Sequence, residues 1–235
     1  MPRHSPFLTL GLMALAACPA ASQAAERRYS INDFDEVRVV GSHVVDVQIG
    51  RATTVSASGA QQAIDAISVE TQGRTLVIQT IQQSLSTWKP AAPGAVRVTV
   101  TVPQLKSVRL EGGGSINVAE VRGPQTTLSL TGSGTLTVAR LSSDRSFVRL
   151  AGSGRLAVAG DVKNLDLNVK GPGDVAAEDL SVSDLRIQAA GSGRVVIKAL
   201  RSADVKQNGA TEITVTGTPA CTVENLGTGS VACGQ

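Results

Sequence analysis

One pattern returns seven times between Leu105 and Gln235: alternating apolar residues, a glycine corner, and alternating apolar residues again. The first glycines of successive corners lie 18 to 20 residues apart. The corner glycines are Gly112, Gly114, Gly132, Gly134, Gly152, Gly154, Gly171, Gly173, Gly191, Gly193, Gly209, Gly227 and Gly229. A fixed period of this length is typical of proteins built from stacked, nearly identical turns, so the repeat strongly restricts the fold.

Apolar columns appear on both sides when the turns are aligned on these corners. Residues that alternate with a period of two mark strands with one buried face. The residues between the columns are mostly polar or small, and we expect them to point outward. Four residues before the corner stand Val108, Leu128, Val148, Leu167, Ile187, Val205 and Val223, and four residues after it Ile116, Leu136, Leu156, Val175, Val195, Ile213 and Val231.

A turn of this length cannot bury its apolar face alone, because it supplies only a few inward side chains. Stacking solves this, since each strand then pairs with the equivalent strand of the next turn, roughly 4.8 Å away. The sequence therefore predicts an all-β fold, a β-helix or flattened β-solenoid, with its regular part at 104–235. Aromatic residues are only 2% of the chain, so small aliphatic side chains must fill the interior. A sharp corner that needs φ above zero explains the glycines.

The first residues match an export signal rather than part of the fold. Phe7 to Ala17 is an apolar run followed by small residues, which is too short to span a bilayer. Cleavage after Ala24 would remove residues 1–24. Alternatively, the sequence from Leu15 to Cys18 resembles a lipoprotein signal, in which case Cys18 would be lipidated and become the new terminus. Both interpretations place the protein in the periplasm or outer cell envelope.

Two cysteines remain after either cleavage, Cys221 and Cys233. They stand six residues before and six after the last corner, in inward columns on opposite arms of one turn. We expect a disulfide between them, which export would permit. The open end of a solenoid needs a cap, and a bridge here would close the last turn.

The segment 29–103 follows the same architecture less evenly. Valines around Gly41 occupy the offsets seen in the later turns, and Val55 is expected to begin another turn. Ala60 to Ala66 suggests a short helix, and Gln72-Gly73-Arg74 suggests a hairpin. The alternating valines from Val96 to Val102 predict a strand that leads into the regular stack.

A long loop is predicted at 79–94, where Pro90 and Pro93 break the pattern. It contains Trp88, the only tryptophan. An aromatic residue in an exposed loop is a candidate contact site. Trp88 could equally cover the N-terminal end of the stack, and the sequence leaves both roles open.

Three features together resemble one known family. These are the opening Phe34-Asp35-Glu36-Val37, the strand ending Val100-Thr101-Val102-Pro103, and the repeated Gly-Ser-Gly corners. Over roughly Asp33 to Thr216 the chain resembles the putative auto-transporter adhesin, head GIN domain family. The resemblance implies a bacterial cell-envelope protein with a right-handed parallel β-helix. It supplies no catalytic residues.

The sequence predicts no catalytic, cofactor-binding or metal-binding residues. The corners lack a following helix that could hold a phosphate, and only Asp174 follows its corner as calcium-binding turns would require. His43 stands alone near Gly41, and Glu178 and Asp179 extend Asp174 into a local charged edge. A formal net charge of +3 gives no indication of nucleic-acid binding.

A binding role therefore fits the sequence best. We expect a non-catalytic, adhesin-like envelope protein that presents its surface to an unknown envelope protein or polymer. It would touch a membrane only through a lipid on Cys18. The alternative is an enzyme that acts on polysaccharides, because β-helices host lyases and hydrolases. Such enzymes need carboxylates gathered on neighbouring turns, and the outward columns show no paired acids.

Overall fold

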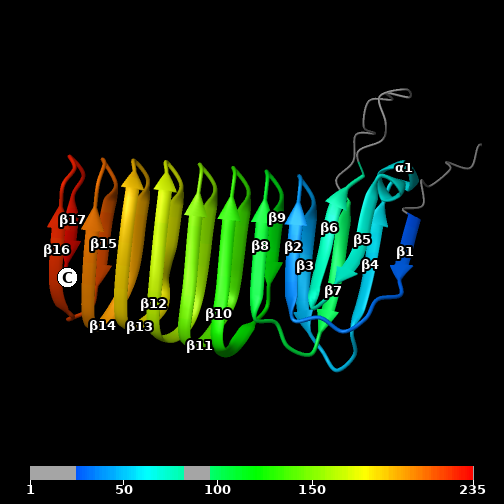
Figure 1. Ribbon diagram of the computed structural model, residues 1–235, viewed down its shortest axis with the longest axis horizontal. Helices are drawn as coiled ribbons and strands as arrows, with labels where there is room; N and C mark the ends of the chain where they lie inside the picture. Colours follow the sequence, from blue (N-terminus) through cyan, green and yellow to red (C-terminus); the bar gives the residue numbers. More distant parts are fainter. Residues whose placement is uncertain (1–24, 82–95, 235) are drawn as a thin grey trace, which may run out of the picture.

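The computed structural model describes residues 25–81 and 96–234, and these form a long stack of β-strand coils. The coils are flattened and stack in one row along the long axis of the molecule, with the C-terminus at one end of the row (Figure 1). The described residues contain one short helix, α1 (Gln61–Asp65), near the other end. The predicted β-solenoid is confirmed.

Parallel pairing joins each coil of the regular part to the next. Leu128 pairs with Val108 on one side and with Val148 on the other, so the columns read from the sequence are the hydrogen-bonded register. The strands of this part are β8 (Ser107–Glu111), β9 (Ser115–Val118), β10 (Val121–Thr131), β11 (Thr135–Ala151), β12 (Arg155–Gly171), β13 (Asp174–Gly191), β14 (Arg194–Gln207), β15 (Glu212–Thr216), β16 (Ala220–Asn225) and β17 (Val231–Cys233).

The inward columns form one continuous core. Leu110, Leu130 and Leu150 stack in consecutive coils and expose no more than 1% of their surface. The same column changes to Gln207 and Asn225 in the last two coils. Their side-chain amides donate to the backbone carbonyls of the following corner, at 2.8 Å for Gln207 and Thr211 and 2.9 Å for Asn225 and Gly229. Each amide thus satisfies a corner carbonyl that would otherwise lack a partner.

The two glycines of a corner have different physical reasons. Gly132 has a φ of 116°, which favours glycine. Gly134 has no such φ, but a Cβ there would lie 2.5 Å from the carbonyl oxygen of Gly114 in the preceding coil. The backbones approach this closely because the N–H of Gly134 donates to the oxygen of Gly112 at 3.0 Å. The expectation of a positive φ thus holds for the first glycine, whose Cβ would also lie 2.5 Å from the oxygen of Gly112, whereas lack of space alone requires the second.

The coil around Gly41 belongs to the same stack, as its offsets predict. Its strands are β2 (Glu36–Val40) and β3 (Val44–Ile49), which pair in parallel with β8 and β9. The chain therefore starts its regular architecture about 70 residues before the uninterrupted repeat, and the intervening segment lies elsewhere.

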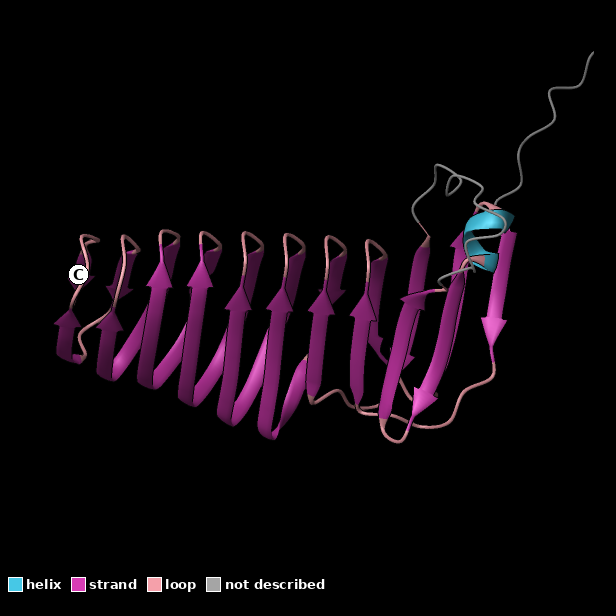
Figure 2. Cartoon of the chain, turned by 45° about the horizontal axis from the view of Figure 1, so that its top comes forward, coloured by secondary structure: helices cyan, strands magenta, loops and turns pink. Residues whose placement is uncertain are grey.

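That intervening segment builds the N-terminal end of the stack (Figure 2). Strands β6 (Thr75–Thr80) and β7 (Arg97–Val102) pair in parallel with the other edges of β2 and β3. Beyond them the pairing becomes antiparallel. β5 (Ile67–Gln72) pairs with β6 across the predicted hairpin, β4 (Thr54–Gly59) pairs with β7, and β1 (Ala25–Tyr29) pairs with β4.

The expectation that Val55 begins another parallel turn is wrong. Val55 lies in β4, opposite Val100 of β7, and the two strands run in opposite directions. The alternation of Val55 and Ala57 marks a half-buried strand in either arrangement, so it could not distinguish them. The layers therefore do not follow chain order, because the coil of β2 and β3 lies between that of β6 and β7 and that of β8 and β9.

The close approach at the corners gives a first prediction. Gly134→Ala should lower the free energy of unfolding by about 1–3 kcal/mol, because the new methyl group meets a backbone oxygen at 2.5 Å and Leu110 Cδ2 at 2.8 Å. Gly113→Ala is the matched control, since the nearest atom to its Cβ is Ser133 Oγ at 3.5 Å. Urea unfolding of both variants checks this, and equal stability would contradict the spatial explanation.

Candidate functional site

The predicted disulfide is present at the C-terminal end of the stack. Cys221 and Cys233 are joined, with their Cα atoms 6.5 Å apart. They continue the inward columns of Ala203 and Val215, which are buried in the preceding coils. Cys18 and Trp88 lie outside the described residues.

The residues considered for chemistry are dispersed. His43 is buried, with its Nε2 3.1 Å from the hydroxyl of Thr80, and burial lowers the pKa of its imidazole. Asp174 pairs with Arg155 at 3.5 Å. No group of three or more His, Cys, Asp or Glu side chains that could hold a metal occurs in residues 25–81 and 96–234.

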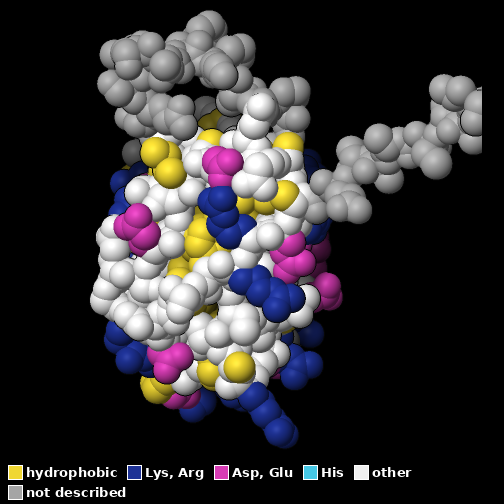
Figure 3. Space-filling view, turned by 90° about the vertical axis from the view of Figure 1, so that its right-hand side faces the viewer, with side chains coloured by type: hydrophobic (Ala, Val, Ile, Leu, Met, Phe, Trp, Pro, Cys, Tyr) yellow, Lys and Arg dark blue, Asp and Glu magenta, His cyan; other side chains and the backbone are white. Residues whose placement is uncertain are grey.

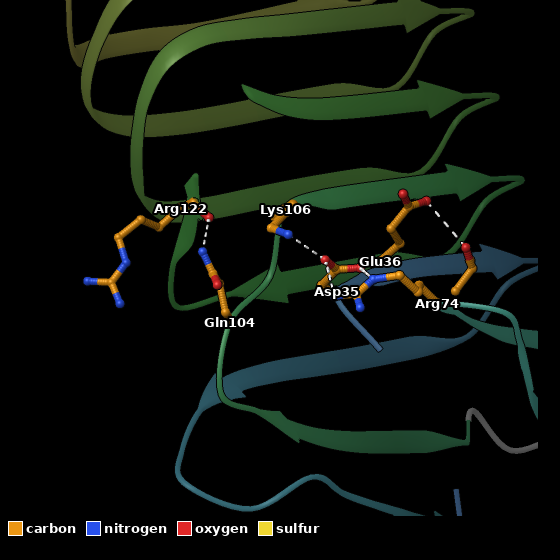
Figure 4. A network of polar contacts seen from close by, with 7 residues as sticks. Asp35, Glu36, Arg74, Gln104, Lys106 and Arg122 are labelled. Atoms are coloured by element: carbon orange, nitrogen blue, oxygen red, sulfur yellow. Dashed lines mark hydrogen bonds and ion pairs between the residues drawn. The ribbon is translucent and has the colours of Figure 1, made fainter. Parts of the chain in front are cut away.

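The one buried carboxylate among the described residues is Asp35, which the sequence analysis names only as part of the opening motif (Figure 4). Arg74 donates to it through Nε at 3.0 Å and Nη2 at 2.6 Å, and Lys106 Nζ lies 2.7 Å from Oδ2. The hydrogen bonds from Arg74 lower the pKa of Asp35 to about 2, with Lys106 adding to the effect.

The Asp35 cluster has a structural explanation. Asp35 precedes β2, Arg74 precedes β6 and Lys106 precedes β8, so the carboxylate connects three adjacent layers at the same edge. Backbone bonds reinforce it, because the N–H of Asp35 donates to Arg74 and the N–H of Lys106 donates to Asp35. A carboxyl group with so low a pKa is ionised at neutral pH and cannot act as a general acid. We therefore assign it to holding the layer order.

Ion pairs between neighbouring coils run along the outer surfaces. Arg38 and Glu111 form a two-bond pair at 3.0 and 2.9 Å, and Arg194 and Glu212 lie 2.9 Å apart. Pairs directly opposite on adjacent strands each contribute a few tenths of a kcal/mol to about 1 kcal/mol. Most carboxylates on these faces are thus occupied in neutralising a cation of the adjacent coil.

One outer face carries two hollows in addition to its ion pairs. We call face A the outer surface formed by the strand segments that lead into the corners, at 127–131, 147–151, 166–170, 186–190, 204–208 and 222–226. Two adjoining hollows of about 160 and 350 Å³ lie on it. They share Asn168 and Gln188, so together they make one shallow groove across several coils.

The smaller hollow contains Phe147, an outward-facing and half-buried aromatic residue. Beside it Asn168 Nδ2 donates to Gln188 Oε1 at 3.3 Å. This bond leaves the oxygen of Asn168 and the amino group of Gln188 without a protein partner among the described residues. An aromatic ring next to a free acceptor and a free donor can contact a ligand that is both apolar and hydroxylated.

The larger hollow forms where a small side chain lies among long ones. Ala190 stands between Lys170 and Asn208 in the neighbouring coils, and exposed Leu226 borders the hollow. The ion pairs of face A are Arg186 with Asp204 at 3.4 Å and Lys206 with Glu224 at 2.8 Å. Lys170, like Arg149 beside Phe147, has no carboxylate within 4.0 Å in the described part of the chain.

The sequence analysis did not identify Phe147 as a contact residue. Its signal was available, since it is the only aromatic residue among the outward columns of the repeat. The amide pair was available in the same way, because aligning the turns on their corners places Asn168 and Gln188 in one outward column, three residues before the corner.

A family model described as putative auto-transporter adhesin, head GIN domain, matches residues 33–219. No curated protein matches the chain. No helix of the described residues is long and apolar enough to cross a membrane.

Solved structures share the fold over most of the chain. A putative adhesin from Bacteroides fragilis NCTC 9343 is 18% identical with a TM-score of 0.80, covering 90% of this chain and 97% of its own. A putative lipid binding protein from Parabacteroides distasonis ATCC 8503 is 21% identical with a TM-score of 0.71, covering 91% and 98%. A putative adhesin from the same strain is 18% identical with a TM-score of 0.67, covering 89% and 96%.

The Asp35 cluster predicts an acid-sensitive step in stability. The folded pKa of Asp35 is about 2, below its ordinary value of 3.8, so its contribution is complete above roughly pH 4 and is lost as the pH falls toward 2. The loss should be about 1–2 kcal/mol, because Arg74 is largely exposed to water. Asp35→Asn should remove this part of the pH dependence, as measured by urea unfolding at several pH values.

Asp144→Asn serves as the control, because its pair with Lys163 is exposed on both sides. It should leave the free energy of unfolding nearly unchanged. If Asp35→Asn showed the same acid sensitivity as the wild type, another group would have to be responsible.

Proposed function

The chain belongs to the family of putative auto-transporter adhesins with a head GIN domain, and on this basis we propose that it is an exported, adhesin-like protein of the cell envelope that binds a polymer or protein partner through face A. The observation that supports this proposal best is Phe147, a half-buried aromatic residue that lines the same hollow as Arg149, Asp166 and the Asn168–Gln188 pair. Strands on a rigid stack hold these side chains in fixed positions, which reduces the entropy lost on binding.

The ligand class that this chemistry favours is a glycan of the envelope. The ring of Phe147 can cover the apolar C–H side of a sugar, while the two amides and Arg149 exchange hydrogen bonds with hydroxyl groups. The groove continues over several coils, so an extended chain fits it better than a compact ligand. A protein partner would use the same residues as an aromatic anchor with a polar rim.

Binding without catalysis is the second part of the proposal. In the described residues, hydrogen bonds from neighbouring groups lower the pKa of the carboxyl groups of Asp35, Asp65 and Asp184, so these three groups are poor proton donors. A glycosidase needs one carboxyl group with a raised pKa to protonate the leaving group. The alternative of a polysaccharide-acting enzyme therefore lacks support from these carboxylates.

Phe147→Ala should weaken binding to the polymer at least about tenfold, because aromatic anchors contribute roughly 1–3 kcal/mol at contact sites. The assay is retardation in gels that contain purified polysaccharides, with neutral and acidic polymers run in parallel. Val196→Ala is the control, since it removes an outward apolar side chain from the opposite face. Retention of full affinity by Phe147→Ala would refute face A as the contact surface.

The same polymers test the absence of catalysis. New reducing ends or unsaturated products after incubation with the wild-type protein would show an enzyme and overturn this part of the proposal.

Export is proposed from the first 24 residues, which lie outside the described part. An intact mass of the protein purified from its native envelope should begin after Ala24, or at a lipid-modified Cys18. A mass that retains Met1 and the apolar run would contradict export in either form.

A further inference from the structure

Among residues 25–81 and 96–234, the last two strands of the stack have a hydrogen-bonded neighbour on one side only. β16 pairs with β14, and β17 pairs with β15. Sheet edges of this kind present a row of unpaired backbone groups that can accept another strand. We call the free edges of β16 and β17 the C-terminal edge.

The direction of the free groups follows from the observed bonds. The N–H of Leu226 donates to the oxygen of Gln207 in the preceding coil. Because successive residues of a strand direct their backbone groups to opposite edges, those of Cys221, Val223 and Asn225 face away from the stack. On β17 the N–H of Gly234 donates to Val215, so the groups of Val231 and Cys233 also face outward.

The same edge exposes apolar side chains, one of which belongs to a core column. Val223 continues the column of Val205, yet 45% of its surface is exposed while Val205 is fully buried. Leu226 is exposed at 73%. The disulfide between Cys221 and Cys233 crosses this coil but leaves these apolar side chains uncovered.

The N-terminal end of the stack is protected in ways that the C-terminal edge is not. Its outer strand β1 carries Glu26, Arg27 and Arg28, and α1 contacts β1, β4 and β5. Basic and acidic side chains are spread over this end, with some apolar atoms between them (Figure 3). Charged side chains on an edge discourage strand addition. Head-to-tail stacking of two copies is therefore disfavoured.

We propose that the C-terminal edge binds the C-terminal edge of a second copy of this chain, with β16 antiparallel to β16 of that copy across a two-fold axis. This arrangement is self-complementary, since each edge offers the donors and acceptors that the other needs. The register that uses all three free residues of β16 places Val223 opposite Val223 of the second copy and Cys221 opposite Asn225.

Charge does not oppose this association. The one charged residue of β16 is Glu224, and Lys206 of the preceding coil neutralises it at 2.8 Å. β17 carries no charged residue. Association would cover Val223 and extend the parallel stacks of both copies into one sheet, and it is independent of any ligand on face A.

Sedimentation equilibrium of the full mature chain over a range of concentrations tests the proposal. The wild type should show a reversible monomer–dimer equilibrium. Val223→Lys should weaken dimerisation at least about tenfold, because two lysines would then meet at the axis. The lysine remains solvated in the monomer, where position 223 is nearly half exposed, so the fold should survive, as checked by circular dichroism.

Thr222→Lys is the matched control, because it adds the same charge one residue away on face A, opposite Asp204. It should dimerise at least as tightly as the wild type, because the proposed register places position 222 opposite Glu224 of the second copy. Hydrogen exchange gives a second readout without mutation: the amides of Val223 and Asn225 should be protected at high protein concentration and exchange freely at low concentration. A wild type that is monomeric throughout, or amides whose exchange is independent of concentration, would overturn the proposal.

Discussion

The structure depends on direct contact between the backbones of neighbouring corners. The oxygen of Gly112 accepts the N–H of Gly134, and the oxygen of Gly114 accepts the N–H of Thr135 at 2.9 Å. Because no side chain separates these corners, each coil is set at strand spacing and in register with the preceding coil. The inward columns then align automatically, since a one-residue slip would turn every apolar side chain outward.

The order of the layers needs a second device, because the repeat alone would stack the coils in chain order. After β1, which belongs to the N-terminal end, the chain forms β2 and β3. It then completes the N-terminal end with β4 to β7 and passes to β8 on the other side of β2. Asp35 lies where these three layers meet and contacts Arg74 from one and Lys106 from another. These contacts join residues 39 and 71 positions apart. They therefore stabilise a layer order whose formation is opposed by the entropy of closing long loops.

Much of this fold can be predicted from the sequence, because its determinants repeat. Seven copies of a corner with apolar columns at fixed offsets identify a solenoid, the core positions and the register. The antiparallel β4 could not be predicted, since alternation in Val55 and Ala57 is the same for both strand directions. The contacts of Asp35 could not be predicted for a related reason. A single Asp beside a strand has no periodic signal, and its partners come from distant segments.

The candidate site on face A is also formed by residues that do not follow the repeat. Outward side chains contact mainly the coils on either side, so their identities can vary without disturbing the corners or the core. The groove on face A therefore arises from local differences in size, such as Ala190 between Lys170 and Asn208, and from one aromatic residue in a polar column. Because every coil offers the same outward grid, the departures from its regular ion pairs mark the positions on which the proposed contact rests. Phe147 and the pairing of Asn168 with Gln188 are two such departures in adjacent coils, and neither is required for the stack to form.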